Sequence, residues 1–276
     1  MASVDARMTR AINEGILVRL GEREELAMPE HESLDRVRRN LLFAGGLLTI
    51  TGALRPLKAL AQATVGAKFR IGVIGSGHIG GTIGGLWVKA GHPVLFSSRH
   101  PDELKDLVAG LGPLARAGTV AEAIAYGDVI FVAVPYGALP GLGQVYDDAL
   151  KGKIVLDAGN AVAARDGPIA DEVERNGVGV TSQKYLPSTK LVRAFNTLSY
   201  KIFANEAHRP DPKLAIPIAG DDANAIQVAS GLVRDAGFEP VIAGKLIDAR
   251  RFQRGASGYG QAVTAAELRQ KLSLTS

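Results

Sequence analysis

Closely spaced glycines that directly follow a short apolar segment constrain the fold of this chain more than any other feature. Residues 69–74, Phe-Arg-Ile-Gly-Val-Ile, predict a buried strand. Residues 75–80, Gly-Ser-Gly-His-Ile-Gly, follow without a linker. The sequence then predicts a helix from about Ile79 to Ala90 and another strand over 94–97. A strand, a glycine turn, a helix and a strand within about 30 residues are typical of a dinucleotide-binding unit.

Each glycine of this turn has its own expected role. Gly75 permits the tight turn, Gly77 lets the backbone approach a pyrophosphate, and Gly80 allows the helix to pack closely on the strand. Free N–H groups at the helix N-terminus attract phosphate. A glycine-rich turn without a ligand is the alternative. We predict a cofactor contact at each residue of the segment: Gly75, Ser76, Gly77, His78, Ile79 and Gly80.

The end of the predicted second strand indicates which nicotinamide cofactor is bound. An NAD site places Asp or Glu about 20 residues after the turn, where the carboxylate binds the ribose hydroxyl. Here that place holds Ser97, Ser98 and Arg99. Hydroxyl groups and a guanidinium suit a 2′-phosphate, because arginine binds phosphate through forked, charged hydrogen bonds. We therefore predict NADP(H), with a solvated loop arginine as the alternative.

Further apolar segments predict the rest of a parallel sheet. Residues 128–136 and 152–160 each contain a strand that is apolar on both faces, which is typical of parallel sheets covered by helices. Ligands of such sheets lie beyond the carboxyl ends of the strands. A helix over 222–236, capped by Asp221 or Asp222, is expected later in the chain. The predicted cofactor contacts beside the nicotinamide are therefore Val134, Pro135, Tyr136, Ala158 and Asn160.

The first 63 residues have the layout of an export signal. Arg38-Arg39 precede an apolar run over 41–54, and Ala61-Gln62-Ala63 ends the segment. The paired arginines resemble a twin-arginine signal and predict the corresponding export machinery as a partner. The run is shorter than the about 20 residues that span a bilayer, so no stable membrane span is expected. An amphipathic helix, an uncleaved anchor and a start at Met28 stay open, and without export the protein would be cytoplasmic.

Composition excludes several other classes of protein. The chain has no cysteine, which removes thiolate metal sites and cysteine nucleophiles. A net charge of +4, with both signs interspersed, does not predict nucleic-acid binding. No paired acids, metal-ligand motif or catalytic triad stands out, so we assign no metal site and no catalytic residue. The arginines at 250, 251 and 254, near Tyr259, are either solvated or part of a pocket for an acidic substrate.

From about Phe69 to Leu272 the chain resembles the deazaflavin-dependent NADP oxidoreductases of the coenzyme F-420 type and related dinucleotide-binding enzymes. The cytoplasmic domain of the six-transmembrane ferric reductases is a more distant resemblance. The first half of the match is shared with many NADP dehydrogenases, whereas the later segments discriminate better. The matching segments are the glycine turn, Ser97 to Arg99, and residues 131–136, 157–160, 190–197, 218–222 and 234–246.

The resemblance implies an α/β, Rossmann-type, doubly wound sheet. We expect residues 64–276 to form one mostly parallel domain whose C-terminal extension, about 181–276, faces the substrate. It also implies hydride transfer between NADP(H) and an F-420 deazaflavin, a flavin or a similar flat acceptor, which needs ring alignment more than an acid or base. Quinones and ferric chelates stay open as acceptors, and so does a homodimer.

The substrate-facing residues follow from the same resemblance. Phe195, Asn196 and Thr197 are expected near the reactive end of the cofactor, with Tyr136 and Asn160 beside them. Alternatively, Phe195 belongs to the core and Asn196 caps the next helix. Two other functions are kept: a non-catalytic sensor of the NADP(H) redox state, and an NADP-dependent reductase of a small imine or carbonyl compound.

Overall fold

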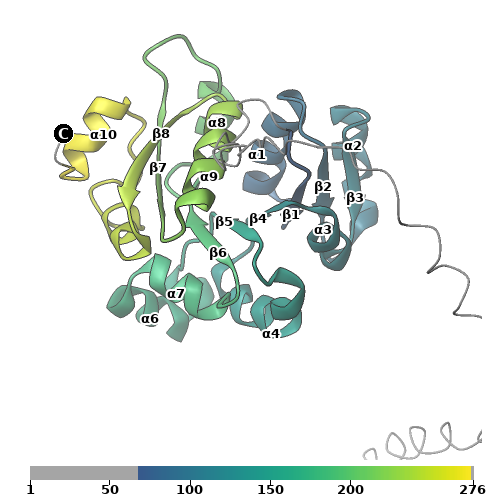
Figure 1. The fold of residues 1–276 in the computed structure, drawn as a ribbon, viewed down its shortest axis with the longest axis horizontal. Coiled ribbons are helices and arrows are strands. Elements are labelled where there is room, and N and C mark those ends of the chain that lie inside the picture. The colour runs from purple at the N-terminus through teal and green to yellow at the C-terminus, as the bar shows by residue number, and fades with distance from the viewer. Residues whose placement is uncertain (1–67, 275–276) are drawn as a thin grey trace, which may run out of the picture. The chain divides into compact units, whose positions relative to one another are not determined.

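A single sheet organises the computed structural model, which describes residues 68–274. The predicted signal segment, 1–63, lies outside these residues. In space the eight strands follow the order β3-β2-β1-β4-β5-β6-β7-β8 (Figure 1). They are β1 (Ile71–Ile74), β2 (Val94–Ser97), β3 (Ala115–Gly118), β4 (Val129–Val132), β5 (Ile154–Asp157), β6 (Lys190–Arg193), β7 (Ala215–Gly220) and β8 (Glu239–Gly244).

The first six strands run parallel to one another. Their order, 3-2-1-4-5-6, is that of the doubly wound dinucleotide-binding fold. β7 then pairs antiparallel with β6 through Val192 with Gly220 and Arg193 with Ala219, and β8 runs parallel to β7. The predicted fold class, a mostly parallel Rossmann-type sheet with a C-terminal extension, is confirmed.

Helices cover both faces of the sheet. The α-helices are α1 (His78–Lys89), α2 (Lys105–Leu111), α3 (Val120–Tyr126), α4 (Leu139–Leu150), α5 (Ala163–Asp166), α6 (Pro168–Asn176), α7 (Val178–Tyr185), α8 (Tyr200–Glu206), α9 (Ala223–Asp235) and α10 (Ala265–Lys271). Short 3-10 helices are η2 (Pro101–Leu104), η3 (Tyr136–Ala138) and η4 (Leu246–Phe252). In Figure 1, α1, α8 and α9 lie together on one side of the strands, and α4, α6 and α7 lie on the other.

An apolar core fills the space on each side of the sheet. On the side of α1, α8 and α9, the buried Trp87 ring packs edge-on against Phe131, with ring centroids 5.0 Å apart. Its indole N–H donates to the Leu232 carbonyl at 2.8 Å, which ties α1 to α9. On the other side, Leu139, Val178 and Phe252 join α4, α7 and η4 in a second cluster. The sheet is therefore buried on both faces, as its apolar strands predict.

Most differences from the sequence-based expectation concern boundaries. α1 begins at His78, and the strand expected within 128–136 ends at Val132, where the chain turns at a proline into η3. Asp222 caps α9 as predicted, since its carboxylate accepts the Ala225 N–H at 2.8 Å.

Within residues 68–274, no helix combines the length and the apolar character that crossing a membrane requires.

Candidate functional site: a nucleotide cradle and an adjoining cavity

Contacts within the protein require glycine at two of the three glycine positions of the turn. Gly75 has φ +91°, and a Cβ there would lie 2.7 Å from the Ala133 carbonyl oxygen. A Cβ on Gly80 would clash with the Gly75 carbonyl oxygen, because α1 starts directly against the turn. These residues therefore have the two packing roles that the sequence predicts for them.

Gly77 differs, because the protein gives no steric reason for a glycine at this position. Its φ is −73°, and no atom of residues 68–274 lies within 4 Å of a Cβ built there. It is exposed and immediately precedes α1, whose first turn contains no acidic side chain. The space beside Gly77 and the N–H groups at the start of α1 fit a pyrophosphate that approaches the backbone closely.

The residues after β2 have different roles in this cradle. The Ser97 side chain is buried and donates to the Val73 carbonyl at 2.8 Å. The Ser97 carbonyl accepts hydrogen bonds from the Gly75 and Ser76 N–H groups at 3.3 and 3.2 Å. Ser97 thus holds the glycine turn against β2, and its hydroxyl is unavailable to a ligand.

Arg99 and Ser98 lie on the open side of the same strand end. Arg99 is exposed, and its guanidinium forms no hydrogen bond or ion pair with any residue in the described part of the chain. The Ser98 hydroxyl accepts the His100 N–H at 3.1 Å and is half-buried. An unpaired guanidinium beside the cradle fits a 2′-phosphate, so the prediction for Arg99 is compatible with its position.

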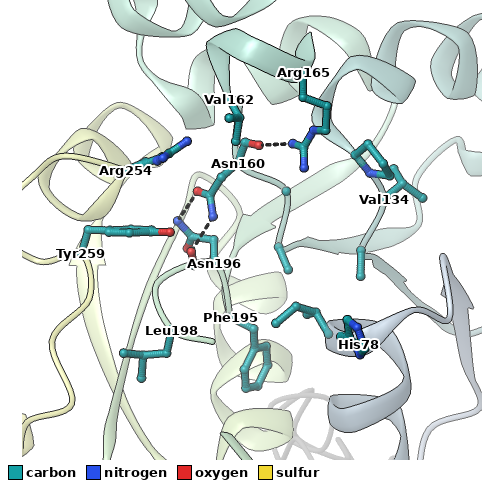
Figure 2. Close-up of a pocket in the computed structure, with 15 residues that line it drawn as sticks. His78, Val134, Asn160, Val162, Arg165, Phe195, Asn196, Leu198, Arg254 and Tyr259 are labelled. Atoms are coloured by element: carbon teal, nitrogen blue, oxygen red, sulfur yellow. Dashed lines mark hydrogen bonds between the residues drawn. The ribbon is translucent and has the colours of Figure 1, made fainter. Parts of the chain in front are cut away.

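A cavity of about 780 Å³ adjoins the cradle at the carboxyl ends of β1, β4, β5 and β6 (Figure 2). Such an edge is where open parallel sheets bind their ligands. Eight of the predicted site residues line it: His78, Ile79, Val134, Pro135, Ala158, Asn160, Phe195 and Asn196. The His78 ring stacks on the Tyr200 ring, with centroids 4.2 Å apart, at the cradle end of this cavity.

Tyr136 and Thr197 were predicted to contact the ligand, but neither residue lines the cavity. Tyr136 is 0% exposed, and its hydroxyl donates to the Val178 carbonyl at 3.1 Å and lies 2.9 Å from the Ser182 hydroxyl. Burial raises the pKa of this phenol well above its usual range, so it stays protonated. Thr197 is 3% exposed. Both side chains were predicted as ligand contacts, and both instead support the wall, because the chain turns them into the core.

The Phe195 ring belongs to the apolar core, although the residue also lines the cavity. The ring packs edge-on against Trp87, Phe131, Phe203 and Phe238, with centroids 5.7 to 6.3 Å apart across this group. Its φ of +58° is left-handed, which is uncommon for a residue other than glycine. The alternative expectation that Phe195 is a core residue is thus confirmed for its side chain. The aromatic contacts hold the ring while the backbone turns toward the cavity.

Two asparagines join the ends of β5 and β6 at the centre of the cavity wall (Figure 2). The Asn160 amide donates to the Asn196 carbonyl at 2.6 Å, and the Asn196 amide donates to Asn160 Oδ1 at 3.3 Å. Asn196 Oδ1 is buried and has no partner among the described residues. Ser199, not Asn196, caps the following helix α8, so that alternative for Asn196 is wrong.

A buried ion pair beneath these asparagines is absent from the sequence-based prediction. Asp157 and Arg193, the last residues of β5 and β6, are paired in register, and both side chains are 0% exposed. The Arg193 guanidinium binds the Asp157 carboxylate and the Gly159 carbonyl, while Asp157 Oδ1 accepts the Gly159 N–H at 2.7 Å. The sequence did contain a signal for this pair, because one strand ends in an acidic residue and the next strand ends in a basic one. The pair fixes the turn that forms the cavity floor.

The far wall comes from a distant part of the sequence. Segment 253–260, after η4, brings Arg254 and Tyr259 to the cavity, and its last residue donates an N–H to the Thr197 carbonyl at 3.0 Å. In Figure 2 they face His78 and Val134 across the cavity. Arg165 also lines it, but forms an ion pair with Asp166 at 2.8 Å. Of the three arginines for which a pocket or a solvated position was left open, Arg254 lines the cavity although it is exposed, whereas Arg250 and Arg251 do not line it.

The strand order, the glycine cradle and the adjoining cavity define a dinucleotide-binding protein of the Rossmann class. Comparison with known families agrees with this class. Residues 70–161 match the family described as NADP oxidoreductase, coenzyme F420-dependent. The matched residues include the glycine cradle and Asn160.

Two kinds of relative extend the comparison. The metalloreductase STEAP3 of Rattus norvegicus is 32% identical over 192 residues, which are 67% of this chain, and the chain spans 36% of that protein. A hypothetical protein from Sinorhizobium meliloti has a solved structure with a TM-score of 0.62 and 27% identity, covering 72% of this chain and 96% of that one. A putative F420-dependent NADP-reductase from Arthrobacter shares the fold, with a TM-score of 0.58, 22% identity and coverage of 66% and 87%. The family match therefore concerns the part of the chain that contains the glycine cradle, and the two solved structures share its fold.

Proposed function

We propose that this protein transfers a hydride between NADP(H) and a flat, flavin-like acceptor. The observation that carries the proposal is the continuity of the site: one cavity of about 780 Å³ extends from the start of α1 to the wall formed by Arg254 and Tyr259. The cavity adjoins the nucleotide cradle at one end and leaves room for a second planar molecule beyond it. The family match over residues 70–161 supports the choice of cofactor and of reaction class.

The chain would act mainly by binding and alignment. Gly77 and the first N–H groups of α1 would hold the pyrophosphate, and Arg99 would hold the 2′-phosphate. Ala158 and Asn160, fixed by the Asp157–Arg193 pair below them, would form the floor at the reactive end. When bound, NADPH supplies a hydride, and that hydride together with one proton from water reduces a flavin-type acceptor. No carboxylate is among the described residues that line the cavity, which agrees with a reaction needing ring alignment rather than an acid or base.

The acceptor class is tested by NADPH oxidation with a panel of acceptors. The full-length protein is mixed with NADPH and, in separate reactions, FMN, a deazaflavin, a quinone and a ferric chelate, and absorbance at the reduced-nicotinamide band is followed. We expect turnover with the flavin or deazaflavin. Tight binding of NADPH by calorimetry, with no turnover across the panel, would instead indicate a redox sensor.

One structural observation favours a second candidate, a reductase of small imine or carbonyl compounds. Such a reaction needs a proton donor, and the half-exposed phenol of Tyr259 lines the cavity. Turnover of an imine or a carbonyl compound without turnover of flavins would support this candidate over the first.

Replacing Arg99 by alanine should weaken NADPH binding on the order of 10- to 100-fold, because a charged, forked hydrogen-bond donor to the 2′-phosphate is lost. The affinity for NADH, which lacks that phosphate, should change little. Calorimetric titration of both cofactors measures the ratio. Arg234→Ala is the matched control, since Arg234 is exposed in the last turn of α9 and does not line the cavity. Equal losses for the two cofactors would contradict the 2′-phosphate assignment.

A further inference from the structure

Of the two arginines that line the cavity, Arg165 and Arg254, only Arg254, which is exposed, forms no ion pair within residues 68–274. Arg165, on the same cavity, is held by Asp166 and donates to the Asn160 carbonyl at 2.7 Å. Arg250 and Arg251, which are close in sequence to Arg254, are also engaged. Arg250 donates to the Arg175 carbonyl at 2.6 Å, and Arg251 pairs with Asp248 at 3.3 Å. The Arg254 guanidinium forms no ion pair and no hydrogen bond within residues 68–274, although it faces the cavity (Figure 2).

A second cavity begins where the first one ends. Its volume is about 480 Å³, and it lies between α6 and the segment that follows η4. Arg254 and Asn160 line both cavities, so they mark the junction between them. Apolar side chains such as Ala170 and Val173 form much of the second wall. The two cavities therefore adjoin at Arg254 and Asn160.

The charges around the junction define what kind of group fits there. Glu174 lines the second cavity and would repel an anion placed against that wall. Arg254 lines both cavities and attracts an anion at the boundary. An anionic group is therefore best placed at the junction itself, with an uncharged or less charged extension beyond it.

We infer that Arg254 binds an anionic group on the arm of the planar acceptor, and that the second cavity holds whatever extends beyond this group. Of this inference, only the planar ring of the acceptor rests on the proposed function. The anion site stands on Arg254, on the junction that the two cavities share, and on the lack of an ion pair to Arg254 among the described residues.

Flavins that share one ring system but differ in their arms test this inference. Riboflavin has a neutral arm, FMN ends in a phosphate, and FAD continues beyond the phosphate. Equilibrium binding to the full-length protein is measured by flavin fluorescence, without turnover. We expect FMN to bind on the order of tenfold tighter than riboflavin, as a charged hydrogen-bonded pair predicts. In Arg254→Gln the ratio should fall to about one, with riboflavin binding unchanged.

The control and the contradicting results separate this inference from the proposed function. Arg251→Gln removes the same charge from a residue that lines neither cavity, and it should keep the preference for FMN. Equal binding of FMN and riboflavin by the native protein, no binding of either, or a preference that survives Arg254→Gln would overturn the anion site. If the preference is present but NADPH reduces neither flavin, the proposed function fails and the anion site stands.

The second cavity has its own variant. Ala170→Leu adds volume to its wall and should weaken FAD binding several-fold, while FMN binding, which ends at Arg254, should not change. Equal effects on FAD and FMN, or no effect on either, would overturn the role of the second cavity. A circular dichroism spectrum identical to that of the native protein ensures that α6 is intact.

Discussion

Replacing Gly80 by alanine should destabilise the protein strongly, whereas replacing Gly77 by alanine should leave its stability nearly unchanged and weaken NADPH binding. A Cβ at position 80 clashes with the Gly75 carbonyl oxygen, a backbone atom that cannot move without displacing the turn. Overpacking of this kind costs about 1–3 kcal/mol, occasionally more. At position 77 a Cβ meets no atom of the described residues within 4 Å, so the neighbour we expect it to disturb is a bound pyrophosphate.

Chemical denaturation and calorimetric titration distinguish the two effects. We expect Gly77→Ala to change the free energy of unfolding by less than about 1 kcal/mol, since the loss of a favourable helix cap and the stiffer unfolded chain offset each other. Its NADPH affinity should fall by at least about tenfold, equivalent to about 1.4 kcal/mol. Unchanged NADPH affinity in Gly77→Ala would show that the pyrophosphate does not lie against this residue.

Removing the charge of Arg193 should have the largest effect on stability of any substitution considered for this protein. Both members of the Asp157–Arg193 pair are 0% exposed, so Arg193→Met leaves a buried carboxylate without its partner. The expected cost is about 3–5 kcal/mol in the free energy of unfolding. Urea denaturation of the full-length protein measures it.

An exposed ion pair serves as the control, and a double variant tests whether the two buried charges stabilise each other. Arg70→Met breaks the exposed pair with Asp128, 2.6 Å, and should cost at most about 1 kcal/mol. Adding Asp157→Asn to Arg193→Met should recover part of the loss, because the asparagine oxygen can still accept the Gly159 N–H. Strictly additive effects of the two substitutions would show that the charges do not stabilise each other.

Local patterns in the sequence were enough to predict the turn and the strands that form the glycine cradle. The glycine turn, the strands on either side of it and the absence of an acid after β2 are all properties of short segments. The capping of α9 by Asp222 is of the same kind. Such features depend on neighbouring residues, so the structure confirms them with shifts of only a few residues.

The acceptor half depends on contacts between distant segments, which these patterns do not encode. The antiparallel pairing of β7 with β6 lets segment 253–260 return to the cavity, so Arg254 reaches a site built from residues about a hundred positions earlier. The inward turn of Tyr136 was missed for a similar reason, since it depends on α7 providing the Val178 carbonyl. The buried pair did have a local signal in the sequence, because Asp157 and Arg193 each stand at the last position of a mostly apolar strand.

The division of the cavity between two stretches of chain has an evolutionary consequence. The cofactor half lies within residues 70–161, the range that matches the family, whereas one short segment, 253–260, carries the far wall. If the proposed function holds, substitutions in that segment would change the acceptor without touching the residues that hold NADP(H). We therefore expect homologues to differ in their acceptors mainly through residues 253–260, and to keep the same coenzyme.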